Sequence, residues 1–442
     1  MILDKIKKKK ANIIVVGLGY VGLPLAVSFA EKGFSVIGYD VSKKKVDMIN
    51  SGKSDIIDVC SDRIENIINK GNFIATTEKD CLGHADVIII CVPTPLTKSQ
   101  EPDISYITKA MIDIKKYFYP GTLIVLESTT YPGTSREVIQ QPLIDAGYIL
   151  DQDYYICYSP ERVDPGNTVY KTENTPKVIG GISKKSTDIG KELYGQIVQR
   201  VIPVATTEIA EMSKLLENTF RSINIAFINE MALLCEKMNI DIWETIEAAS
   251  TKPFGFMKFN PGPGIGGHCI PLDPIYLSWK AKESKFFSKF IELAQETNQK
   301  MSEYMVYKAM MTLNKAKKSI NNSKILLIGM AYKENVDDLR ESPSLEVFRK
   351  LKALGAKISF CDPLATKFKD EDGMVYTSID VDYQEMKEFD LVILLTCHDL
   401  FDINKIAESS KLILDTKNYL SGTFTNKTTC FGNTTVSSSL SS

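Results

Sequence analysis

Short apolar runs alternate along the chain with longer segments in which apolar residues recur every three or four positions. Residues 12–16 form a β-branched run, and similar runs occupy residues 34–39, 87–92 and 123–126. Runs of this length predict buried strands, and the amphipathic stretches between them predict helices. Because strands that alternate with helices build parallel sheets, we predict a doubly wound α/β domain over residues 1–203.

A long stretch without glycine or proline follows this first domain. Neither residue type occurs from residue 204 to residue 252, and apolar side chains recur there at helical spacing. We predict a helix from near Thr206 to near Met238, which at 1.5 Å per residue spans roughly 45 Å. A helix of that length suits a connector with a surface for a second subunit, or simple packing within one domain. We assign residues 204–310 to a central helical region that also carries the cysteine loop described below.

The opening pattern returns in weaker form near residue 323. The run at 324–329 precedes a helical stretch, and the run at 390–396 resembles the one at 86–92. This partial repeat predicts a second doubly wound domain over residues 311–420. The expected fold class is therefore α/β, with two doubly wound Rossmann-like domains joined by a long central helix. Residues 421–442, rich in Ser and Thr, are predicted to form a disordered tail.

Composition excludes several classes of protein. A chain of 442 residues that is 44% hydrophobic has ample apolar surface for two or three domains, and 53 basic residues against 55 acidic ones leave no large basic footprint for a nucleic acid. Residues 11–30 carry no charge and follow Lys7–Lys10, as in a signal or membrane helix. Their glycines and Pro24 favour a strand, turn and helix instead, so we expect no membrane association and a cytoplasmic location.

The cysteines and histidines are arranged in a way that argues against disulfides and metal. Nine cysteines occur without any Cys-x-x-Cys pair, which is typical of a reducing compartment. Only three histidines are present, and no two of them have the spacing of metal ligands. We therefore expect no metal centre.

A glycine-rich loop joins the first predicted strand to the helix that follows it. Gly17 allows the tight turn, Gly19 allows the backbone to approach a pyrophosphate, and Gly22 allows close packing of the helix on the strand. Asp40 ends the second strand, where its carboxylate would accept hydrogen bonds from a ribose diol and repel a 2′-phosphate. This pattern predicts NAD as the cofactor, although Lys43–Lys45 nearby would tolerate NADP.

The segment from Asn260 to Pro274 is the most informative part of the sequence. Four glycines precede Cys269, and Pro271 and Pro274 suit the first turn of a helix running toward Lys282. The positive end of a helix dipole favours a thiolate, and small residues leave room for a ligand at the sulfur. We therefore predict that Cys269 is a nucleophile rather than an ordinary core cysteine.

Two further pairs of polar residues allow a functional and an ordinary interpretation. Lys214 and Asn218 lie one turn apart on the predicted long helix, where they could donate to one oxygen atom or simply face solvent. Glu161 and Arg162 lie in a predicted loop and are equally typical of an exposed surface.

A third pair lies in the first loop of the second predicted domain. Lys333 and Arg340 are two cations in that loop, which suits a ligand diphosphate. They also stand beside Asp337 and Asp338, as in a solvated charge cluster.

Seven motifs together resemble the UDP-sugar 6-dehydrogenases, also called the UDP-glucose/UDP-mannuronate dehydrogenase family. In chain order they are Gly17–Gly22, Val92–Pro95, Ser128–Gly133, Ser159–Arg162, Lys214 with Asn218, Gly266–Cys269, and Gly329–Lys333 with Arg340–Pro343. The resemblance extends over roughly residues 11–420. It implies oxidation of a sugar C6 alcohol to a carboxylate in two NAD-dependent steps, with NAD on the first domain, the UDP-sugar on the last, and a homodimer formed through the long helix.

The resemblance also implies a role for each catalytic residue. Cys269 would hold the aldehyde as a thiohemiacetal and then as a thioester. Lys214 and Asn218 would stabilise the oxyanion, and Asp273 would take part in proton transfer and orient Lys214 or a water. Each such donor lowers the barrier by roughly 3–4 kcal/mol.

The remaining implied residues activate water or bind the ligands. Glu161 and Thr129 would position or activate the water that hydrolyses the thioester. The implied cofactor-binding residues are Gly17, Gly19, Tyr20, Val21, Gly22, Asp40, Pro93, Thr94 and Thr129. The implied substrate-binding residues are Glu161, Arg162, Lys214, Asn218, Lys258, Gly266, Lys333 and Arg340.

The residues after the cysteine indicate a branch of the family. Family members acting on UDP-glucose carry Pro-Lys-Asp there, whereas Ile270–Asp273 reads Ile-Pro-Leu-Asp and follows His268. This resembles the N-acetylhexosamine branch, and Pro271 with Pro274–Leu277 resembles most the enzymes for UDP-N-acetylglucosamine in surface polysaccharide synthesis. UDP-N-acetylmannosamine is the second choice and UDP-glucose the third. A two-electron hydroxyacid dehydrogenase and a non-catalytic NAD-binding protein remain as alternatives.

Overall fold

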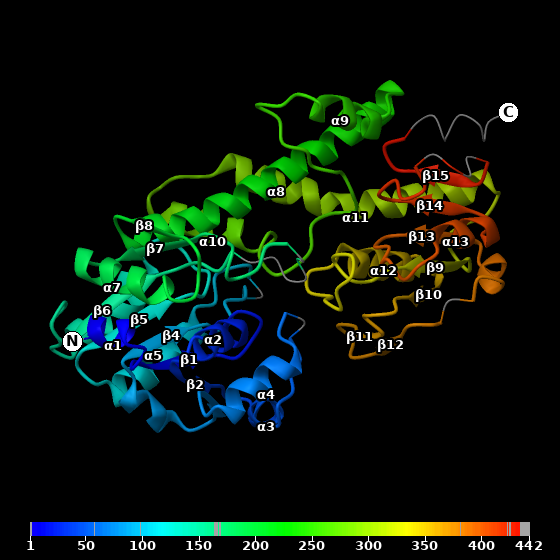
Figure 1. Cartoon of the computed structure of the whole chain (residues 1–442). Coiled ribbons are helices and arrows are strands. Elements are labelled where there is room, and N and C mark those ends of the chain that lie inside the picture. Colours follow the sequence, from blue (N-terminus) through cyan, green and yellow to red (C-terminus); the bar gives the residue numbers. More distant parts are fainter. Residues whose placement is uncertain are drawn as a thin grey trace. The chain divides into compact units, whose positions relative to one another are not determined.

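The chain folds into two compact units. The computed structural model describes residues 2–56, 58–97, 99–162, 167, 169–380, 382–421, 423 and 426–433. Unit 1 comprises Met1–Glu217 and Ile275–Phe286, and unit 2 comprises Asn218–Pro274 and Phe287–Ser442 (Figure 1). The predicted central region, residues 204–310, is therefore divided between the units. The reason is that helix α8, Thr207–Met238, begins in unit 1 and ends in unit 2.

Unit 1 is built on one eight-stranded sheet with the order β3-β2-β1-β4-β5-β6-β7-β8. Neighbouring strands are parallel except β6 and β7, which are antiparallel. The strands are β1 Asn12–Val16, β2 Ser35–Tyr39, β3 Phe73–Thr76, β4 Val87–Ile90, β5 Thr122–Leu126, β6 Tyr154–Tyr158, β7 Lys177–Gly181 and β8 Val201–Val204. The order reverses between β1 and β4, which is where a doubly wound sheet binds its ligand.

Helices cover both faces of this sheet, as continuous apolar strands require. Ile13 and Val15 pack on one face and Ile14 and Val16 on the other, so β1 is buried on both sides. The helices on the first face are α1 Ile2–Lys7, α2 Gly22–Glu31, α3 Lys43–Asn50, α4 Ser61–Asn69 and α7 Lys184–Tyr194. Those on the second face are η1 Lys79–His84, α5 Ser105–Tyr117, η2 Ser135–Gln140 and α6 Gln141–Asp145.

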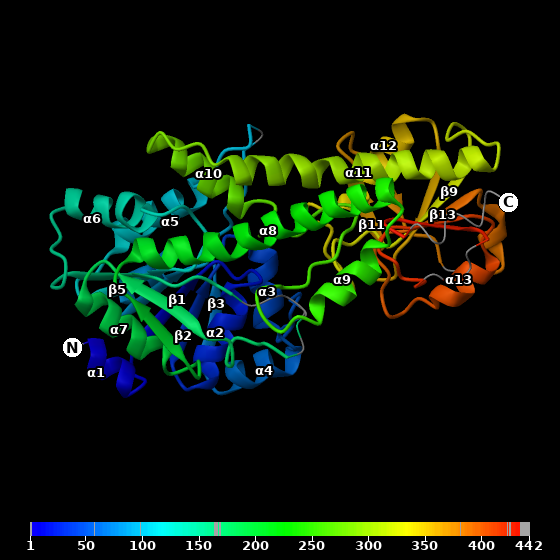
Figure 2. The same ribbon diagram turned by 90° about the horizontal axis from the view of Figure 1, so that it is seen from above.

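Unit 2 contains a parallel sheet with the order β10-β9-β13-β14-β15. Its strands are β9 Lys324–Ile328, β10 Lys357–Cys361, β13 Leu391–Leu394, β14 Ile413–Asp415 and β15 Thr428–Cys430, with a separate antiparallel pair β11 Lys367–Lys369 and β12 Val375–Thr377. On one face of this five-stranded sheet, a core contains side chains of α9 Ile242–Ser250, α11 Lys289–Lys315 and α12 Pro343–Ala353. The other face is covered by η3 Glu385–Glu388 and α13 Ile403–Ser409. Within this unit α11 runs along the carboxyl-terminal half of α8 (Figure 2).

The prediction of a disordered tail over residues 421–442 is wrong for its middle part. Strand β15 pairs with β14, and the residue after it, Phe431, is fully buried. The indole of Trp243 donates to the carbonyl of Phe431 at 2.8 Å. Two β-branched threonines and one large apolar side chain are enough to form an edge strand, although the segment is rich in hydroxyl groups. Residues 434–442 lie outside the described residues.

The predicted repeat extends to individual backbone contacts. Gly17 and Gly329 each follow the first strand of their sheet with φ of +92° and +81°. A Cβ atom on Gly17 would lie 2.6 Å from the carbonyl oxygen of Cys91, and one on Gly329 would lie 1.7 Å from that of Thr396. In both sheets the crossing from first strand to first loop therefore requires glycine, because the backbone passes directly over the end of the neighbouring strand, β4 in unit 1 and β13 in unit 2.

Equivalent carboxylates also fix the start of both sheets. Asp86 accepts a hydrogen bond from the backbone N–H of Asn12 at 3.0 Å, and Asp390 accepts one from that of Lys324 at 2.9 Å. Asp86 precedes β4 and Asp390 precedes β13, the strand that lies beside the first strand of each sheet, and each pairs with the residue that begins that first strand. The two doubly wound sheets therefore share this hydrogen bond as well as a first strand that lies between two parallel neighbours.

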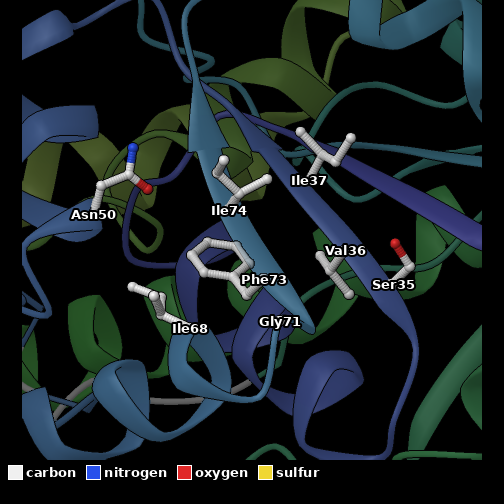
Figure 3. A pocket seen from close by; sticks show the side chains of 8 residues that line it. All are labelled: Ser35, Val36, Ile37, Asn50, Ile68, Gly71, Phe73 and Ile74. Carbon is white, nitrogen blue, oxygen red and sulfur yellow. The ribbon is translucent and has the colours of Figure 1, made fainter.

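A pocket of about 590 Å³ lies at the edge of the first sheet and is lined by β2, β3 and the ends of α3 and α4 (Figure 3). Asn50 closes part of this edge, since its amide both donates to and accepts from the backbone of Ala75 at 2.9 Å. No ionisable side chain is among the residues that line the pocket. The chemistry suggested by the sequence therefore lies elsewhere.

Two features are absent from the described residues. No helix among them is long and apolar enough to cross a membrane. No cluster of three or more His, Cys, Asp or Glu side chains within the same residues has the arrangement of a metal site.

Asp362 organises the centre of unit 2 and provides a test of the fold. Its fully buried carboxylate contacts His398 at 3.1 Å and accepts the N–H groups of Met330 and Ala331. Burial opposes ionisation, but the hydrogen bonds from His398 and the backbone outweigh it and hold the pKa of Asp362 at about 2.

We expect Asp362→Asn to lower the free energy of unfolding by about 3 kcal/mol, because several buried donors lose a charged acceptor. Since the folded pKa lies below the unfolded one, this difference should persist from pH 7 to about pH 4 and shrink as the pH falls toward 2. Urea unfolding, with hydrogen exchange of the β9 and β10 peptides, measures it. The exposed Asp372→Asn is the control, and equal losses for both variants would contradict the assignment.

Candidate active site

The glycine loop of unit 1 has the geometry that a dinucleotide requires. A Cβ atom on Gly22 would lie 1.8 Å from the carbonyl oxygen of Gly17, so Gly22 is required for helix packing. A Cβ on Gly19 would meet no heavy atom within 4 Å, which leaves open space beside the start of α2. No side chain caps that helix at Val21, so its first N–H groups remain suited to an anion. These residues fit a pyrophosphate.

Asp40 is held in place beside this loop by the backbone. One carboxylate oxygen accepts the N–H of Leu18 at 2.9 Å and the other accepts that of Ser42 at 2.8 Å. The carboxylate is partly exposed and has further lone pairs, so it suits a ribose diol. Of the nearby lysines, Lys45 is paired with Asp55 at 3.4 Å.

The equivalent carboxylate of unit 2 has no such capacity. Asp362 accepts two N–H groups from the first loop of its sheet and two from Leu364 and Ala365, besides its contact with His398. Its side chain is 0% exposed. The two halves of the repeat thus differ where a dinucleotide would bind, because only Asp40 has room for a ribose.

The cysteine loop of unit 2 is tied to the long helix α8. The amide of Asn218 donates to the carboxylate of Asp273 at 2.5 Å, and both side chains are at least 95% buried. The carbonyl of Cys269 accepts the N–H groups of Leu272 and Asp273, which forms the turn that leads into α10, Asp273–Glu283. Helix α10 thus begins two residues later than Pro271, and Cys269 precedes it by four residues.

Gly266 and Gly267 pack closely against Tyr332, a contact that the sequence did not predict. A Cβ on Gly266 would lie 2.6 Å from the Cβ of Tyr332, and one on Gly267 would lie 2.8 Å from the ring of Tyr332. The N–H of Gly267 also donates to the carbonyl of Arg340 at 3.0 Å. These glycines therefore pack the cysteine loop against the loop that follows β9, rather than only clearing space at the sulfur.

Two amide side chains fix the part of the loop that precedes these glycines. Asn229 on α8 accepts the N–H of Gly262 at 2.9 Å and donates to Asn298 on α11 at 3.1 Å. Asn298 donates in turn to the carbonyl of Ser222 at 3.1 Å. The loop that carries Cys269 is therefore held by both long helices within unit 2.

The predicted residues of unit 1 lie at the carboxyl edge of its sheet or on α8. Lys214 is 8% exposed and lies one helical turn before Asn218, so these two polar groups share a face of α8. Glu161 accepts the N–H of Arg162 at 2.7 Å and is 3.3 Å from Lys177. The guanidinium of Arg162 contacts Glu217 at 2.8 Å.

The other predicted residues of unit 1 differ in exposure. Thr94 is buried, whereas Pro93 is exposed, and Thr129, Tyr20 and Val21 are partly exposed.

The predicted substrate cations of unit 2 differ in their surroundings. Arg340 is clamped by Asp338, with its Nη2 atom 2.6 Å from the carboxylate, and Lys333 is partly exposed on the same loop. Lys258 instead pairs with Glu247 on an exposed surface.

Sequence reasoning missed several charged residues near these groups. Glu127 and Lys177 form a buried ion pair at 2.9 Å beside Glu161. The sequence feature that could have indicated this pair is the acidic residue directly after the apolar run at 123–126. Lys417 follows β14 by two residues and its side chain packs 3.6 Å from the Cβ position of Gly262. Burial lowers the pKa of Lys417, although Glu334 opposes the shift.

The chain carries a dinucleotide loop on its first doubly wound sheet, then a cysteine loop, then a second doubly wound sheet. These features together indicate a dehydrogenase. Comparison with known proteins agrees: models of the UDP-glucose/GDP-mannose dehydrogenase family match residues 11–198 as the NAD binding domain, 208–300 as the central domain and 326–422 as the UDP binding domain. The chain belongs to this family. It is an NAD-dependent nucleotide-sugar dehydrogenase, so the predicted fold class, enzyme class and cofactor are confirmed.

Individual relatives cover almost the whole chain. The UDP-N-acetyl-D-mannosamine dehydrogenase of Methanococcus vannielii is 37% identical over 435 residues, or 95% of each chain, and Protein CapL of Staphylococcus aureus is 34% identical over 398 residues, or 89% of this chain and 91% of CapL. The solved structure of UDP-D-ManNAc dehydrogenase from Pyrococcus horikoshii superposes with a TM-score of 0.87 at 31% identity, covering 96% of this chain and 99% of the other. The relatives from Methanococcus vannielii and Pyrococcus horikoshii are named for N-acetylmannosamine rather than for the predicted N-acetylglucosamine.

Two alanine variants separate the roles of the loop glycines. We expect Gly19→Ala to fold normally but to weaken NAD binding at least about tenfold, because its methyl group enters the space suited to the pyrophosphate. Gly22→Ala should instead lower the thermal midpoint, because its methyl group overlaps the carbonyl of Gly17. Calorimetric titration with NAD and thermal unfolding measure both. Unchanged NAD affinity in Gly19→Ala would disprove the assignment of the loop.

Proposed function

We propose that the protein oxidises C6 of UDP-N-acetyl-D-mannosamine to the uronate with two molecules of NAD, as a step toward surface polysaccharide precursors. The buried Asn218–Asp273 hydrogen bond carries this proposal, since it holds two polar groups of the required kind beside the turn of Cys269. The names of the relatives favour mannosamine over the glucosamine epimer. UDP-N-acetylglucosamine becomes the second candidate and UDP-glucose the third.

The first stage converts the alcohol to a thiohemiacetal. NAD, held by the loop of Gly17, Gly19 and Gly22 and by Asp40, would supply the hydride acceptor for both oxidations. Lys214 and Asn218 donate hydrogen bonds to the alkoxide. These hydrogen bonds stabilise the alkoxide strongly because both side chains are almost fully buried. Asp273 takes part in proton transfer, and Cys269 adds to the aldehyde carbon so that no free aldehyde is released.

The second stage gives a thioester, which water hydrolyses. Glu161 takes a proton from the attacking water, with Thr129 as a second group that positions it. The water oxygen bonds to the acyl carbon, and Cys269 leaves as the thiolate. This assignment requires a carboxylate at the edge of the sheet that stays ionised at neutral pH, and a lysine ammonium 3.3 Å from Glu161 favours that state.

The nucleotide part of the substrate is assigned to unit 2. Lys333, Arg340 and Lys417 are three cations on loops at the carboxyl edge of its sheet, where doubly wound domains hold ligands. Gly266 would contribute through its backbone. Lys258 is the weakest member of the predicted set, because it is engaged with Glu247 at the surface.

The number of NADH molecules formed per sugar tests this function. With limiting UDP-N-acetylmannosamine we expect two NADH per sugar, and less turnover of UDP-N-acetylglucosamine, UDP-N-acetylgalactosamine and UDP-glucose run in parallel. Cys269→Ser should lose steady-state oxidation by at least about a hundredfold, because no thioester forms. The control is Cys235→Ser, a half-buried cysteine of α8.

Each alternative predicts a different count. Two NADH from another sugar would keep the mechanism and change the substrate. One NADH per substrate, with full activity in Cys269→Ser, would favour a two-electron dehydrogenase. No NADH from any of the four sugars would favour an NAD-binding protein without this activity.

We further propose that the enzyme is a homodimer that pairs through α8. Seven apolar side chains on this helix are 38–59% exposed, and at 100° per residue they fall within an arc of about 80°. They are Ile209, Met212, Leu216, Phe220, Phe227, Leu234 and Met238. A stripe along a whole 32-residue helix is more than the scattered apolar exposure of a monomer.

A charge in the middle of this stripe tests the dimer. We expect Phe227→Asp to shift the protein toward monomer, with a dissociation constant raised at least about a hundredfold, because the carboxylate would be buried without a partner. Sedimentation equilibrium measures the constant. Arg221→Gln, about 120° away on the same helix, should leave it unchanged. A monomeric wild-type protein would refute the proposal.

A further inference from the structure

A cluster of charged side chains is buried in unit 1 beside Glu161. Glu127 directly follows β5, Glu161 follows β6 by three residues, and Lys177 begins β7. Because β6 and β7 are antiparallel, with Tyr158 opposite Gly180, continuation of the register brings Lys177 opposite Glu161. A parallel β7 would place its first residue at the other edge of the sheet. The one strand reversal in this sheet therefore brings a lysine to its carboxyl edge.

The ammonium of Lys177 bridges two carboxylates. Its Nζ atom is 2.9 Å from Glu127 and 3.3 Å from Glu161, and it also donates to the carbonyl of Pro160 at 3.4 Å. Glu127 is in turn hydrogen-bonded by the hydroxyl of Tyr194, whose ring centroid lies 5.2 Å from the ammonium. The side chains of Lys177 and Glu127 are 5% and 0% exposed, whereas that of Glu161 is 17% exposed.

This exposure divides the cluster into an inner pair and an outer carboxylate. Lys177 and Glu127 neutralise each other in the interior, where an isolated charge would be very costly. Burial lowers the pKa of Lys177, but the two carboxylates outweigh it, so the net shift is upward and the ammonium is permanent. Burial raises the pKa of Glu127 to about 7 against the opposing effect of Lys177. Glu161 is the carboxylate of this cluster with partial access to solvent.

We propose that Lys177 is a positioning residue for the hydrolytic step: with Glu127 and Tyr194 holding its ammonium, it keeps Glu161 oriented and ionised as the base that activates water. This inference rests on the proposed function. Lys177 itself touches neither the water nor the substrate. In the hydrolysis one water proton passes to Glu161, the water oxygen bonds to the acyl carbon, and the carbon–sulfur bond to Cys269 breaks with the electron pair on sulfur.

The arrangement predicts opposite effects for two substitutions. Lys177→Met removes the cation and leaves Glu127 beside Glu161, so Glu161 should bind its proton more tightly and hydrolysis should need a higher pH. Glu127→Gln removes the competing anion, so the acid limb of hydrolysis should move to lower pH. Tyr194 and the thiols of Cys91 and Cys157 also face the cluster, and burial raises the pKa of each. On its outer side the guanidinium of Arg162, paired with Glu217, donates to the carbonyl of Pro176 beside Lys177.

The test follows one turnover of full-length enzyme with NAD and UDP-N-acetylmannosamine. In Lys177→Met we expect the two NADH of the first turnover at nearly the wild-type rate, then steady-state turnover slowed at least about tenfold. Intact-mass spectrometry should find the uronyl thioester on the enzyme, and the acid limb of kcat should move to higher pH. Lys177→Arg should largely restore hydrolysis, and the exposed Lys191→Met on α7 should behave as wild type.

Each outcome decides between the proposals. Wild-type kcat, pH profile and acyl-enzyme level in folded Lys177→Met would overturn the role of Lys177 alone. If Lys177→Met fails to fold, the acid limb of kcat in Glu127→Gln decides instead. An acid limb that stays at the wild-type pH, or moves to higher pH, overturns the inference. Absence of NADH formation by the wild type with any of the four UDP-sugars would overturn the proposed function, and the inference with it.

Discussion

A carboxylate at the end of a buried strand must find partners within the protein, and this constraint shapes both sheets. Asp40, Glu127, Asp362 and Asp415 all end or directly follow such strands. Leaving any of them without donors would cost several kcal/mol, so nearby loops fold to supply backbone amides, a lysine or a histidine. The chemistry then depends on how completely each carboxylate is satisfied. Asp362 accepts four backbone N–H groups and contacts His398, so it is saturated and structural, whereas Asp40 has acceptor capacity left for a ligand.

The two sheets show how one architecture is adapted to two nucleotides. Both begin with a strand, a glycine of positive φ and an aspartate that anchors the first residue of the sheet. They diverge after the glycine, since unit 1 enters a helix at once and unit 2 inserts a cation-bearing loop from residue 330 to residue 342. In unit 1 the uncapped helix start suits a pyrophosphate, and in unit 2 the inserted loop supplies charged side chains instead.

The sequence predicted what depends on local pattern. The apolar runs located the strands to within a few residues, the long stretch without glycine or proline located α8 to within one residue at its start, and the glycine loop could be understood position by position. What it could not predict depends on contacts between distant residues. The pairing of Lys177 with Glu127, 50 positions earlier, arises only from strand order and the antiparallel β7. The packing of Tyr332 on Gly266 and Gly267 is equally non-local, and the Thr-rich strand β15 forms only because β14 offers it an edge.

The amide of Asn50 has a consequence for how copies of this protein meet. An open sheet has two edge strands whose unpaired backbone groups can recruit a strand from another molecule. At β3 the side chain of Asn50 already occupies both backbone groups of Ala75. Growth of the sheet into chains of molecules is thereby obstructed at this edge, even though Ile74 beside it is 56% exposed. At this edge, association is thus left to side-chain surfaces, which can close on themselves as a finite assembly, rather than to backbone pairing, which propagates without limit.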